Sequence, residues 1–302
     1  MPEYEAYRAQ VALLLRCLPA VAEFPEFALK GGTALNLFVH DMPRLSVDID
    51  LTYLPFDAYD EALPRIRSGM SAIGSMLQRQ VPGSSVQPAA QGAPKLLVRT
   101  AEAAIKIEPN VVLRGNLLPT TESELCPAAA EDFELFLQVR QLATAELYAG
   151  KLCAALDRQH PRDFYDLMLS LRAGQISDDI RRAFVAYVAG HRRPIAEILA
   201  PQAQPLGPSF ESQFAGMTRE PVSVVDLEAV QVAVFEWVRT ALTSDERRFL
   251  LSVKQGEPEW DLLPFPDLAR WPAIQWKLAN IRRMDPRAHE AAVERLRSVL
   301  RL

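Results

Sequence analysis

The hydrophobic period of the sequence changes once, near residue 134, and this change limits the folds open to the chain. Before it, apolar and polar residues alternate in several short runs, which is the pattern of strands with one buried face. After it, apolar residues recur every three to four positions, which is typical of amphipathic helices. We therefore expect an α+β protein with a small mixed sheet in the first half and helices in the second.

The expected elements of the first half are separated by Pro, Gly and Ser. Helices are expected at 4–18, ahead of Pro19 and Pro25, at 33–40, with the Thr33 hydroxyl as N-cap, and at 57–80. The segment 81–94 has the composition of a loop with room for an edge strand. Strands are expected at 27–30 (FALK), 45–54 (LSVDIDLTYL), 95–100 (KLLVRT) and 103–112 (AAIKIEPNVV), the last two as neighbours.

The formal net charge of -5 argues against a protein that is coated in Lys and Arg to grip duplex DNA. Any contact with nucleic acid must be local, and basic residues do gather in a few places. Each such cluster has an ordinary alternative, a solvated helix face. The clusters are Arg181 with Arg182, His191 to Arg193, and Arg282, Arg283 and Arg287 with Arg295, Arg297 and Arg301.

The sequence shows neither a signal peptide nor an apolar run long enough to span a membrane, so we expect a cytoplasmic protein. Cys17, Cys126 and Cys153 are odd in number, widely spaced and without a CxxC pair. This spacing favours neither a disulfide framework nor a cysteine-bound zinc site. We expect buried thiols.

Two aspartates lie one residue apart in the expected strand 45–54. Because side chains alternate across a strand, Asp48 and Asp50 share one face, and Val47, Ile49 and Leu51 share the other. Neighbouring carboxylates repel one another unless a cation or water screens them. Mg²⁺ is commonly held by one or two carboxylates together with substrate phosphates. The pair is thus a candidate metal site, although an exposed strand face is the ordinary alternative.

Two further features accompany this pair. The glycines of Gly31-Gly32-Thr33 form a turn at the start of a helix, where backbone N–H groups can receive a phosphate. A plain turn with an N-cap is the alternative. On the strand 103–112, Glu108 faces away from the apolar side. It would supply a third carboxylate for a two-metal site, or simply an exposed strand face.

A second group of charged residues lies in the segment AELYAGKLCAALDRQHPRDFYDL. Lys151 and Arg158 are seven residues apart on one helix, so both cations can serve one site. Pro161 starts a new helix, whose apolar stripe leaves Asp163 and Asp166 on the opposite side. The alternative is a surface ion pair between Arg162 and Asp166, with Lys151 extending from a core helix.

These motifs resemble a known superfamily. A GG[ST] turn followed by DxD and by a later acid is similar to the nucleotidyltransferases of the DNA polymerase beta type. The fuller string LKGGTALNL…RLSVDIDLTY resembles the AbiEii family, the toxins of abortive-infection (type IV) toxin–antitoxin systems. The resemblance implies a nucleotidyltransferase core at 1–140 and a helical domain at 141–302 that completes the active site, with a linker-like stretch at 200–222.

The resemblance also implies roles for particular residues. The lysine, Lys151, would contact the triphosphate, and an aspartate, Asp166 in preference to Asp163, would orient or deprotonate the attacking group. Ser46 matches a position near the nucleotide, or is a serine at the start of a strand. The positions that match the family in the second segment are Glu146, Lys151, Arg158, Arg162, Asp163, Asp166 and Leu167.

The segment 242–281 resembles a part of some AbiEii proteins, with no known catalytic role. Its tryptophans, Trp260, Trp271 and Trp276, are expected to pack between helices, or alternatively to stack on RNA bases.

The expected activity is transfer of a nucleotide from an NTP, with Mg²⁺ or Mn²⁺, to an acceptor. The family resemblance implies that this acceptor is the 3′ end of tRNA, whose extension or blocking would stop translation. A cognate AbiEi-type antitoxin is an expected partner, with or without direct contact. Transfer to a protein or a small molecule, and a regulator that binds a nucleotide without turnover, are the alternatives.

Overall fold

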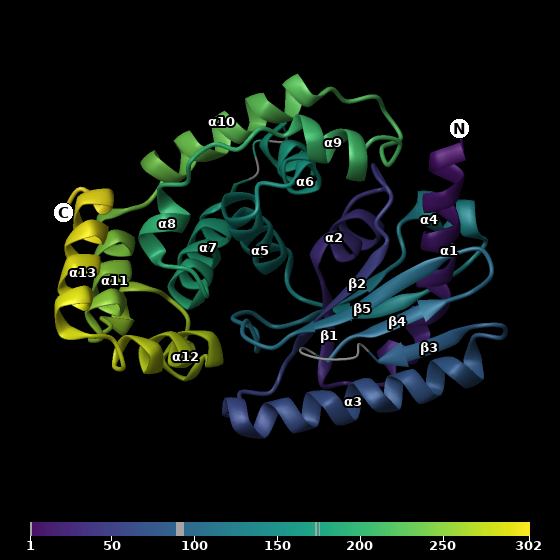
Figure 1. Ribbon diagram of the computed structural model, residues 1–302, viewed down its shortest axis with the longest axis horizontal. Coiled ribbons are helices and arrows are strands. Elements are labelled where there is room, and N and C mark those ends of the chain that lie inside the picture. Colours follow the sequence, from purple (N-terminus) through teal and green to yellow (C-terminus); the bar gives the residue numbers. More distant parts are fainter. Residues whose placement is uncertain (1, 89–93, 173, 175) are drawn as a thin grey trace. The chain divides into compact units, whose positions relative to one another are not determined.

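The alternating runs of the first half form one mixed β-sheet in a computed structural model, which describes residues 2–88, 94–172, 174 and 176–302 (Figure 1). Within those residues the sheet has seven strands, in the order β3-β4-β5-β2-β1-β7-β6. The α+β class expected from the sequence is confirmed. The strands are β1 Phe27–Lys30, β2 Asp48–Tyr53, β3 Ser85–Pro88, β4 Leu96–Arg99, β5 Ala104–Asn110, β6 Thr121–Glu124 and β7 Gln138–Gln141.

The chain divides into two compact units. The first comprises Met1–Leu147 and Phe214–Val222, and the second comprises Tyr148–Gln213 and Ser223–Leu302. The division falls inside helix α5, Thr144–Asp157, rather than at residue 140. The stretch 200–222 includes the helix α9, Gly207–Gln213, and its last part packs with the first unit, where Met217 O accepts a hydrogen bond from Leu45 N.

Strand β2 lies in the middle of the sheet, antiparallel to β1 and parallel to β5. Its apolar face, with Ile49, Leu51 and Tyr53, is buried, and Tyr53 packs edge-on against Phe27 of β1 at 5.8 Å between ring centroids. The helices α1, Pro2–Ala22, and α3, Tyr59–Gln80, are the long helices of this unit. Gly69 of α3 lies against the Phe27 ring, so this helix covers the apolar face of the sheet.

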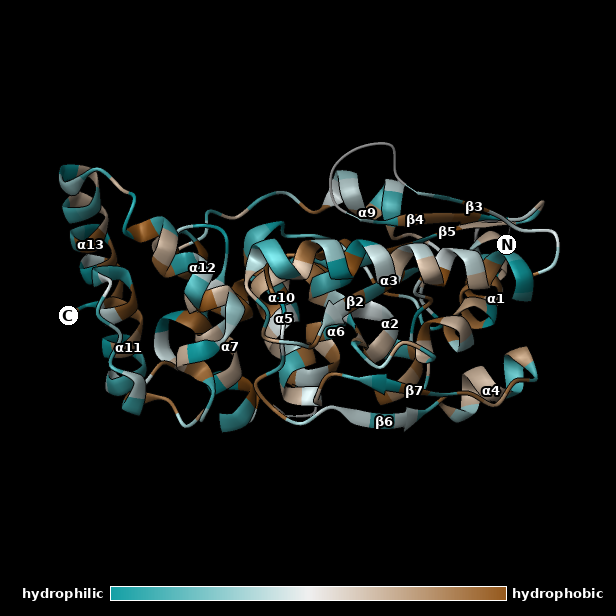
Figure 2. Cartoon of the chain, turned by 90° about the horizontal axis from the view of Figure 1, so that it is seen from below, coloured by the Kyte–Doolittle hydropathy of each residue, from teal (hydrophilic) through white to brown (hydrophobic). Residues whose placement is uncertain are grey.

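Hydrophobic periodicity explains α3, which alternates between hydrophobic and hydrophilic stretches along its length (Figure 2). Its residues Ile66, Met70, Ile73 and Leu77 recur at helical spacing and are buried. Helix α1 continues past Pro19 to Ala22, so this proline does not end the helix as the sequence predicts. The remaining helices of the unit are the short α2, Gly31–Ala34, the π-helical η1, Leu35–Val39, and α4, Pro127–Phe133.

The second unit is helical, as the three-to-four residue period predicts. Its central helix is α7, Asp178–Gly190, in which the eight consecutive residues 183–190 are buried, among them Phe184 and Tyr187. Phe184 meets Trp237 edge-on at 5.5 Å, and Tyr187 packs against Trp271 at 5.3 Å. The other helices are α6 Pro161–Arg172, α8 Ile195–Leu199, α10 Val224–Thr240, α11 Ser244–Gln255, α12 Pro272–Ile281 and α13 Pro286–Leu300, with 3₁₀ turns at Trp260–Leu262 and Leu268–Arg270.

One part of the sheet lies where the sequence predicts helix. Residues 138–141, which read as the start of the helical region, form strand β7, which pairs parallel with β1 at Leu29↔Gln141 and antiparallel with β6. As for membranes, the described portion of the chain contains no helix with the length and apolarity required to cross one.

Helices α7 and α11 are joined by a buried ion pair at Glu246. This carboxylate accepts hydrogen bonds from Arg181 Nε at 2.9 and 3.0 Å, and it also accepts one from Thr243 N at 2.8 Å as part of a capping box. We expect Glu246→Ala to lower the free energy of unfolding by about 3 kcal/mol, because it leaves Arg181 without its buried partner. Urea denaturation measures this change.

Asp245→Ala is the matched control, since Asp245 is exposed on the same helical turn. We expect it to cost less than about 0.5 kcal/mol. Equal losses in the two variants would show that Glu246 does not join the helices.

Candidate active site

Asp48 and Asp50 lie on the face of β2 that is turned away from the buried apolar row. Paired residues of neighbouring strands point to the same face, so the sheet register brings charged side chains of three strands together on this face. Lys30 of β1 is opposite Asp50, and Glu108 of β5 is opposite Asp50 on the other side. The predicted third carboxylate is therefore next to the pair in the sheet.

Glu108 is engaged by a lysine in this structure. Lys95 Nζ lies 3.2 Å from Glu108 Oε1, and both side chains are partly exposed. In keeping with this, the described residues contain no group of three or more His, Cys, Asp and Glu side chains arranged to hold a metal ion. Asp48 and Asp50 offer two hard oxygen donors on one partly exposed face, which fits Mg²⁺ held by two carboxylates and completed by substrate phosphates.

The glycine turn packs directly against this acidic face. Gly31 has φ +74°, a conformation that favours glycine, and a Cβ at this position would collide with Asp50 Oδ2. At Gly32 a Cβ would lie 2.7 Å from Arg44 Nη2 and 3.0 Å from Ser46 Oγ. Both glycines are thus required by close contacts, and these contacts bring Gly31, Gly32, Ser46 and Asp50 together.

Thr33 does not cap a helix, contrary to the sequence prediction. The helix starts at Gly31, and the Thr33 hydroxyl lies 2.6 Å from Asp48 O, to which it donates, and 3.0 Å from Ser46 Oγ. Helix α2 continues after one turn as the π-helical η1, whose residues 35–39 replace the regular helix expected there. The role of Thr33 is therefore to attach the glycine turn to the strand that carries the aspartates.

The sequence analysis missed Arg44. This side chain is 2% exposed, donates from Nη1 to Leu45 O at 2.9 Å, and places Nη2 beside Gly32. A guanidinium so deeply buried keeps a positive charge directly behind the glycine turn. The signal was the two-residue period, because Arg44, Ser46, Asp48 and Asp50 occupy alternate positions of one extended segment.

The second unit gathers the other charged candidates around Asp163. Lys151 Nζ lies 3.0 Å from Asp163 Oδ1 and 2.8 Å from Asp166 Oδ2. Arg158 donates to both oxygens of Asp163, at 2.7 and 2.9 Å. The sequence predicts both aspartates on the side of α6 opposite its apolar stripe, but Asp163 is 0% and Asp166 1% exposed. They are buried because Lys151 and Arg158 compensate their charge.

Two cations dominate the electrostatics of Asp163. Burial alone would raise the pKa of Asp163, but the charges and hydrogen bonds of Lys151 and Arg158 outweigh it and hold the pKa well below its usual range. A carboxylate with both oxygens bound by cations is a poor proton acceptor. It is well placed to fix the two cations relative to one another, and Arg158, 59% exposed, is the member of the group that faces solvent.

Glu146, which also matches the family pattern, is 1% exposed in the first unit. Its carboxylate accepts hydrogen bonds from Leu117 N at 2.9 Å and Leu118 N at 3.0 Å. The Glu146 carboxylate thus connects the loop after β5 to the start of α5.

Comparisons with known proteins place this geometry in context. The sequence profile of the family described as "Nucleotidyl transferase AbiEii toxin, Type IV TA system" matches residues 12–280. No curated protein matches the sequence. Among solved structures, MenT4, a nucleotidyltransferase toxin from Mycobacterium tuberculosis H37Rv, is similar in fold, with a TM-score of 0.59 at 22% identity over 97% of this chain and 92% of that chain. Terminal uridylyl transferase 4 from Trypanosoma brucei with bound GTP aligns at a TM-score of 0.27 and 14% identity, over 94% and 90% of the two chains.

The contact between Gly31 and Asp50 yields a sharp test. We expect Gly31→Ala to reduce nucleotidyltransferase activity by about 100-fold. The new methyl group would overlap with Asp50 Oδ2 and push the carboxylate out of its position. Steady-state transfer assays measure the loss, and thermal unfolding checks the fold.

Gly83→Ala controls for backbone strain. Gly83 has φ +75°, almost the same as Gly31, but a Cβ there would meet nothing within 4 Å. It should unfold at a slightly lower temperature and keep its activity. If both variants lose activity alike, the methyl group at position 31 is not acting through Asp50.

The lowered pKa of Asp163 predicts a pH-dependent stability. Because the folded-state pKa is below the unfolded value of about 4, the stabilisation is complete above that value. It is lost as the pH falls toward the folded-state pKa. Between pH 4 and pH 2.5 the wild type should therefore lose more stability than Asp163→Asn, and the difference should approach about 1.4 kcal/mol per pH unit at the lower end of this range. Urea titrations at several pH values measure the difference, and parallel curves for the two proteins would contradict it.

Proposed function

The chain belongs to the AbiEii nucleotidyl transferase toxin family of type IV toxin–antitoxin systems, and from this premise we propose that it adds a nucleotide to the 3′ end of tRNA. The observation that carries the proposal is the contact between the glycine turn and the acidic face of β2. Gly31 lies against the Asp50 carboxylate, and Thr33 is hydrogen-bonded to the backbone of Asp48. Phosphates that approach the turn would thus meet the two carboxylates.

The first unit would hold the reacting end of the NTP. Gly31 and Gly32 have no side chains that would keep phosphates away from the backbone, and the Ser46 hydroxyl lies beside them. Arg44, buried behind Gly32, would add positive charge to the phosphate-binding turn. Mg²⁺ or Mn²⁺ held by Asp48 and Asp50 would neutralise phosphate charge and acidify the acceptor hydroxyl. Glu108, engaged by Lys95, stays a candidate third ligand.

The second unit would supply charge for the leaving group. We assign Lys151 and Arg158 to the triphosphate, as the family resemblance implies, and attack by the acceptor hydroxyl would release pyrophosphate against them. Asp163 would fix both cations in place. Asp166, whose Oδ2 lies 2.8 Å from Lys151 Nζ, is the aspartate that we assign to orienting or deprotonating the attacking hydroxyl.

The physiological setting follows from the family. Blocking or extending the 3′ end of tRNA would stop translation, which is a mode of action suited to a toxin. We propose that a cognate AbiEi-type antitoxin counteracts it, with or without direct contact.

A labelling experiment tests the acceptor. The protein is incubated with total RNA, Mg²⁺ and each labelled NTP in turn, and the labelled molecules are sequenced at the 3′ end. We expect labelled tRNA with at least one NTP, and a loss of label of at least about 1,000-fold in Asp48→Ala. Asp57→Ala is the control, since Asp57 lies in the same unit and bonds Tyr53 and Arg65.

Other products would assign another function. Label on protein or on a small molecule would contradict the tRNA acceptor and keep the transfer reaction. Binding of NTP without any labelled product would indicate a regulator and refute catalysis.

A further inference from the structure

The C-terminal helices carry a cluster of arginines that the reaction does not use. Arg282 and Arg283 follow helix α12, and Arg287 is in the first turn of α13. All three are exposed, and within the described parts of the chain none of their side chains forms an ion pair or a hydrogen bond. Since the protein has a net charge of -5, three uncompensated arginines between positions 282 and 287 are a local excess of positive charge.

Several other exposed arginines of this unit are compensated by carboxylates. Arg239 pairs with Glu236 at 3.9 Å, Arg248 with Glu259 at 2.5 Å, and Arg270 with Asp267 at 3.3 Å. The acids nearest to the arginine cluster in sequence are Asp285 and Glu290. The Asp285 carboxylate caps α13 by accepting from Ala288 N at 3.0 Å, and within the described residues Glu290 forms no ion pair with Arg287. The cluster therefore remains free to bind an anion from outside.

A tryptophan lies next to these arginines. Trp276 of α12 is partly exposed, whereas Trp271 is 1% exposed and packs on Tyr187. In the described residues Trp276 has no aromatic neighbour, while Trp260 packs near Phe249 at 6.4 Å. Arg282, the C-cap of α12, still has helical backbone angles, and Trp276 lies six residues before it on the same helix. A flat ring beside guanidinium groups suits a base and its phosphate.

The arginine turn is held rigidly. Arg282 N and Arg283 N donate to Leu278 O and Asn280 O at 3.0 and 3.2 Å, and Met284 N donates to Ile281 O at 3.0 Å. Pro286 then starts α13 at its first position. Little conformational entropy would be lost in this backbone on binding, which favours a docking surface over a flexible tail.

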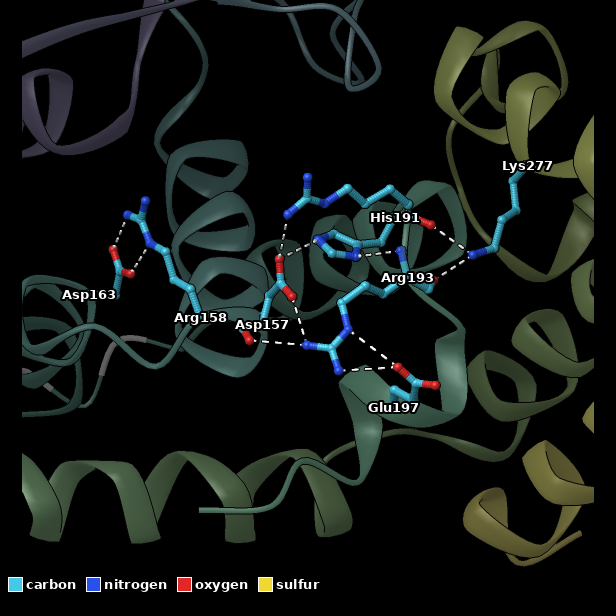
Figure 3. Close-up of polar contacts among 8 residues, drawn as sticks. Asp157, Arg158, Asp163, His191, Arg193, Glu197 and Lys277 are labelled. Atoms are coloured by element: carbon cyan, nitrogen blue, oxygen red, sulfur yellow. Dashed lines mark hydrogen bonds and ion pairs between the residues drawn. The ribbon is translucent and has the colours of Figure 1, made fainter. Parts of the chain in front are cut away.

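Helix α12 is also connected, through Lys277 and Arg193, to Asp157 at the end of α5, within the same unit (Figure 3). Lys277 is buried and donates to His191 O and Arg193 O at 2.7 and 2.6 Å. Arg193 in turn donates to the Asp157 carboxylate at 2.8 Å, and Asp157 directly precedes Arg158. An RNA held on the outer side of α12 would thus be bound by an element that is connected to the Arg158 end of α5.

We propose that Trp276, Arg282, Arg283 and Arg287 form a docking surface for the acceptor RNA, with the arginines on its phosphates and the tryptophan on an unpaired base. This inference rests on the proposed function for the identity of the RNA. It adds a place where the body of the acceptor binds outside the reaction site, and so explains how an acidic protein selects an RNA substrate.

Direct RNA binding tests the surface independently of nucleotide transfer. Fluorescence anisotropy with labelled bulk tRNA is measured at several salt concentrations for the full-length protein and for the triple variant Arg282→Gln, Arg283→Gln, Arg287→Gln. We expect the triple variant to bind tRNA about tenfold or more weakly. A plot of the logarithm of the association constant against the logarithm of the salt concentration should become less steep by about 2, as expected for the loss of three phosphate contacts. NTP binding without RNA should be unchanged.

A second triple variant is the matched control. Arg239→Gln, Arg248→Gln and Arg270→Gln remove the same charge from exposed positions of the same unit, where each arginine already has a carboxylate partner. We expect tRNA affinity within about twofold of the wild type. Trp276→Ala should weaken binding about fivefold without changing the salt slope, and Trp276→Phe should restore most of it.

Several outcomes would overturn the proposal. One is a tRNA affinity of the first triple variant equal to that of the wild type, and another is an equal loss of tRNA affinity in the control triple variant. A third is capture of an acidic protein through these arginines with no difference in tRNA binding. If the wild type binds tRNA through this surface but transfers no nucleotide to it, the docking surface stands and the proposed acceptor reaction fails.

Discussion

Strand β2 places carboxylates on one face and a hydrophobic row on the other, and the rest of the first unit depends on that alternation. The row of Ile49, Leu51 and Tyr53 requires a cover, which α3 helps to supply. On the opposite face the Asp50 carboxylate leaves room for nothing larger than glycine at position 31. Strand β2 thus contributes its apolar row to the core and positions Asp48 and Asp50 beside the glycine turn, where we propose that a phosphate binds.

Charge compensation organises the second unit in a comparable way. Asp163 is fully buried and is tolerable there only because Lys151 and Arg158 occupy both of its oxygens. The same compensation fixes the two cations that we assign to the triphosphate. Buried Lys277, whose pKa is lowered to about 8 by burial, extends this polar network to α12 through backbone carbonyls.

The sequence predicts the parts of the fold that local pattern determines. Alternation identified β2, β4 and β5, and the loop-like stretch 81–94 contains the edge strand β3. Strand β7 is not predicted, because QVRQ has no local strand signal and pairs only with β1 and β6, which are distant in sequence.

The sequence predicts Thr33 as a helix cap because its hydrogen-bond partners, Asp48 O and Ser46, are brought to it only by the tertiary fold. The burial of Asp163 was missed since it depends on cations of another helix. Arg44 follows the same two-residue alternation as Asp48 and Asp50, so the sequence predicts which face of the segment carries it. The sequence does not predict that its side chain is buried.

The central claim is that the glycine turn and the acidic face of β2 together hold a metal-bound NTP. Crystals grown with Mn²⁺ and a non-hydrolysable NTP analogue would test it most directly, because manganese is located by its anomalous scattering. The account predicts a manganese peak within coordination distance of the Asp48 and Asp50 carboxylates, and phosphates against Gly31 and Gly32. A nucleotide bound with its phosphates elsewhere, and no manganese at these two aspartates, would contradict it.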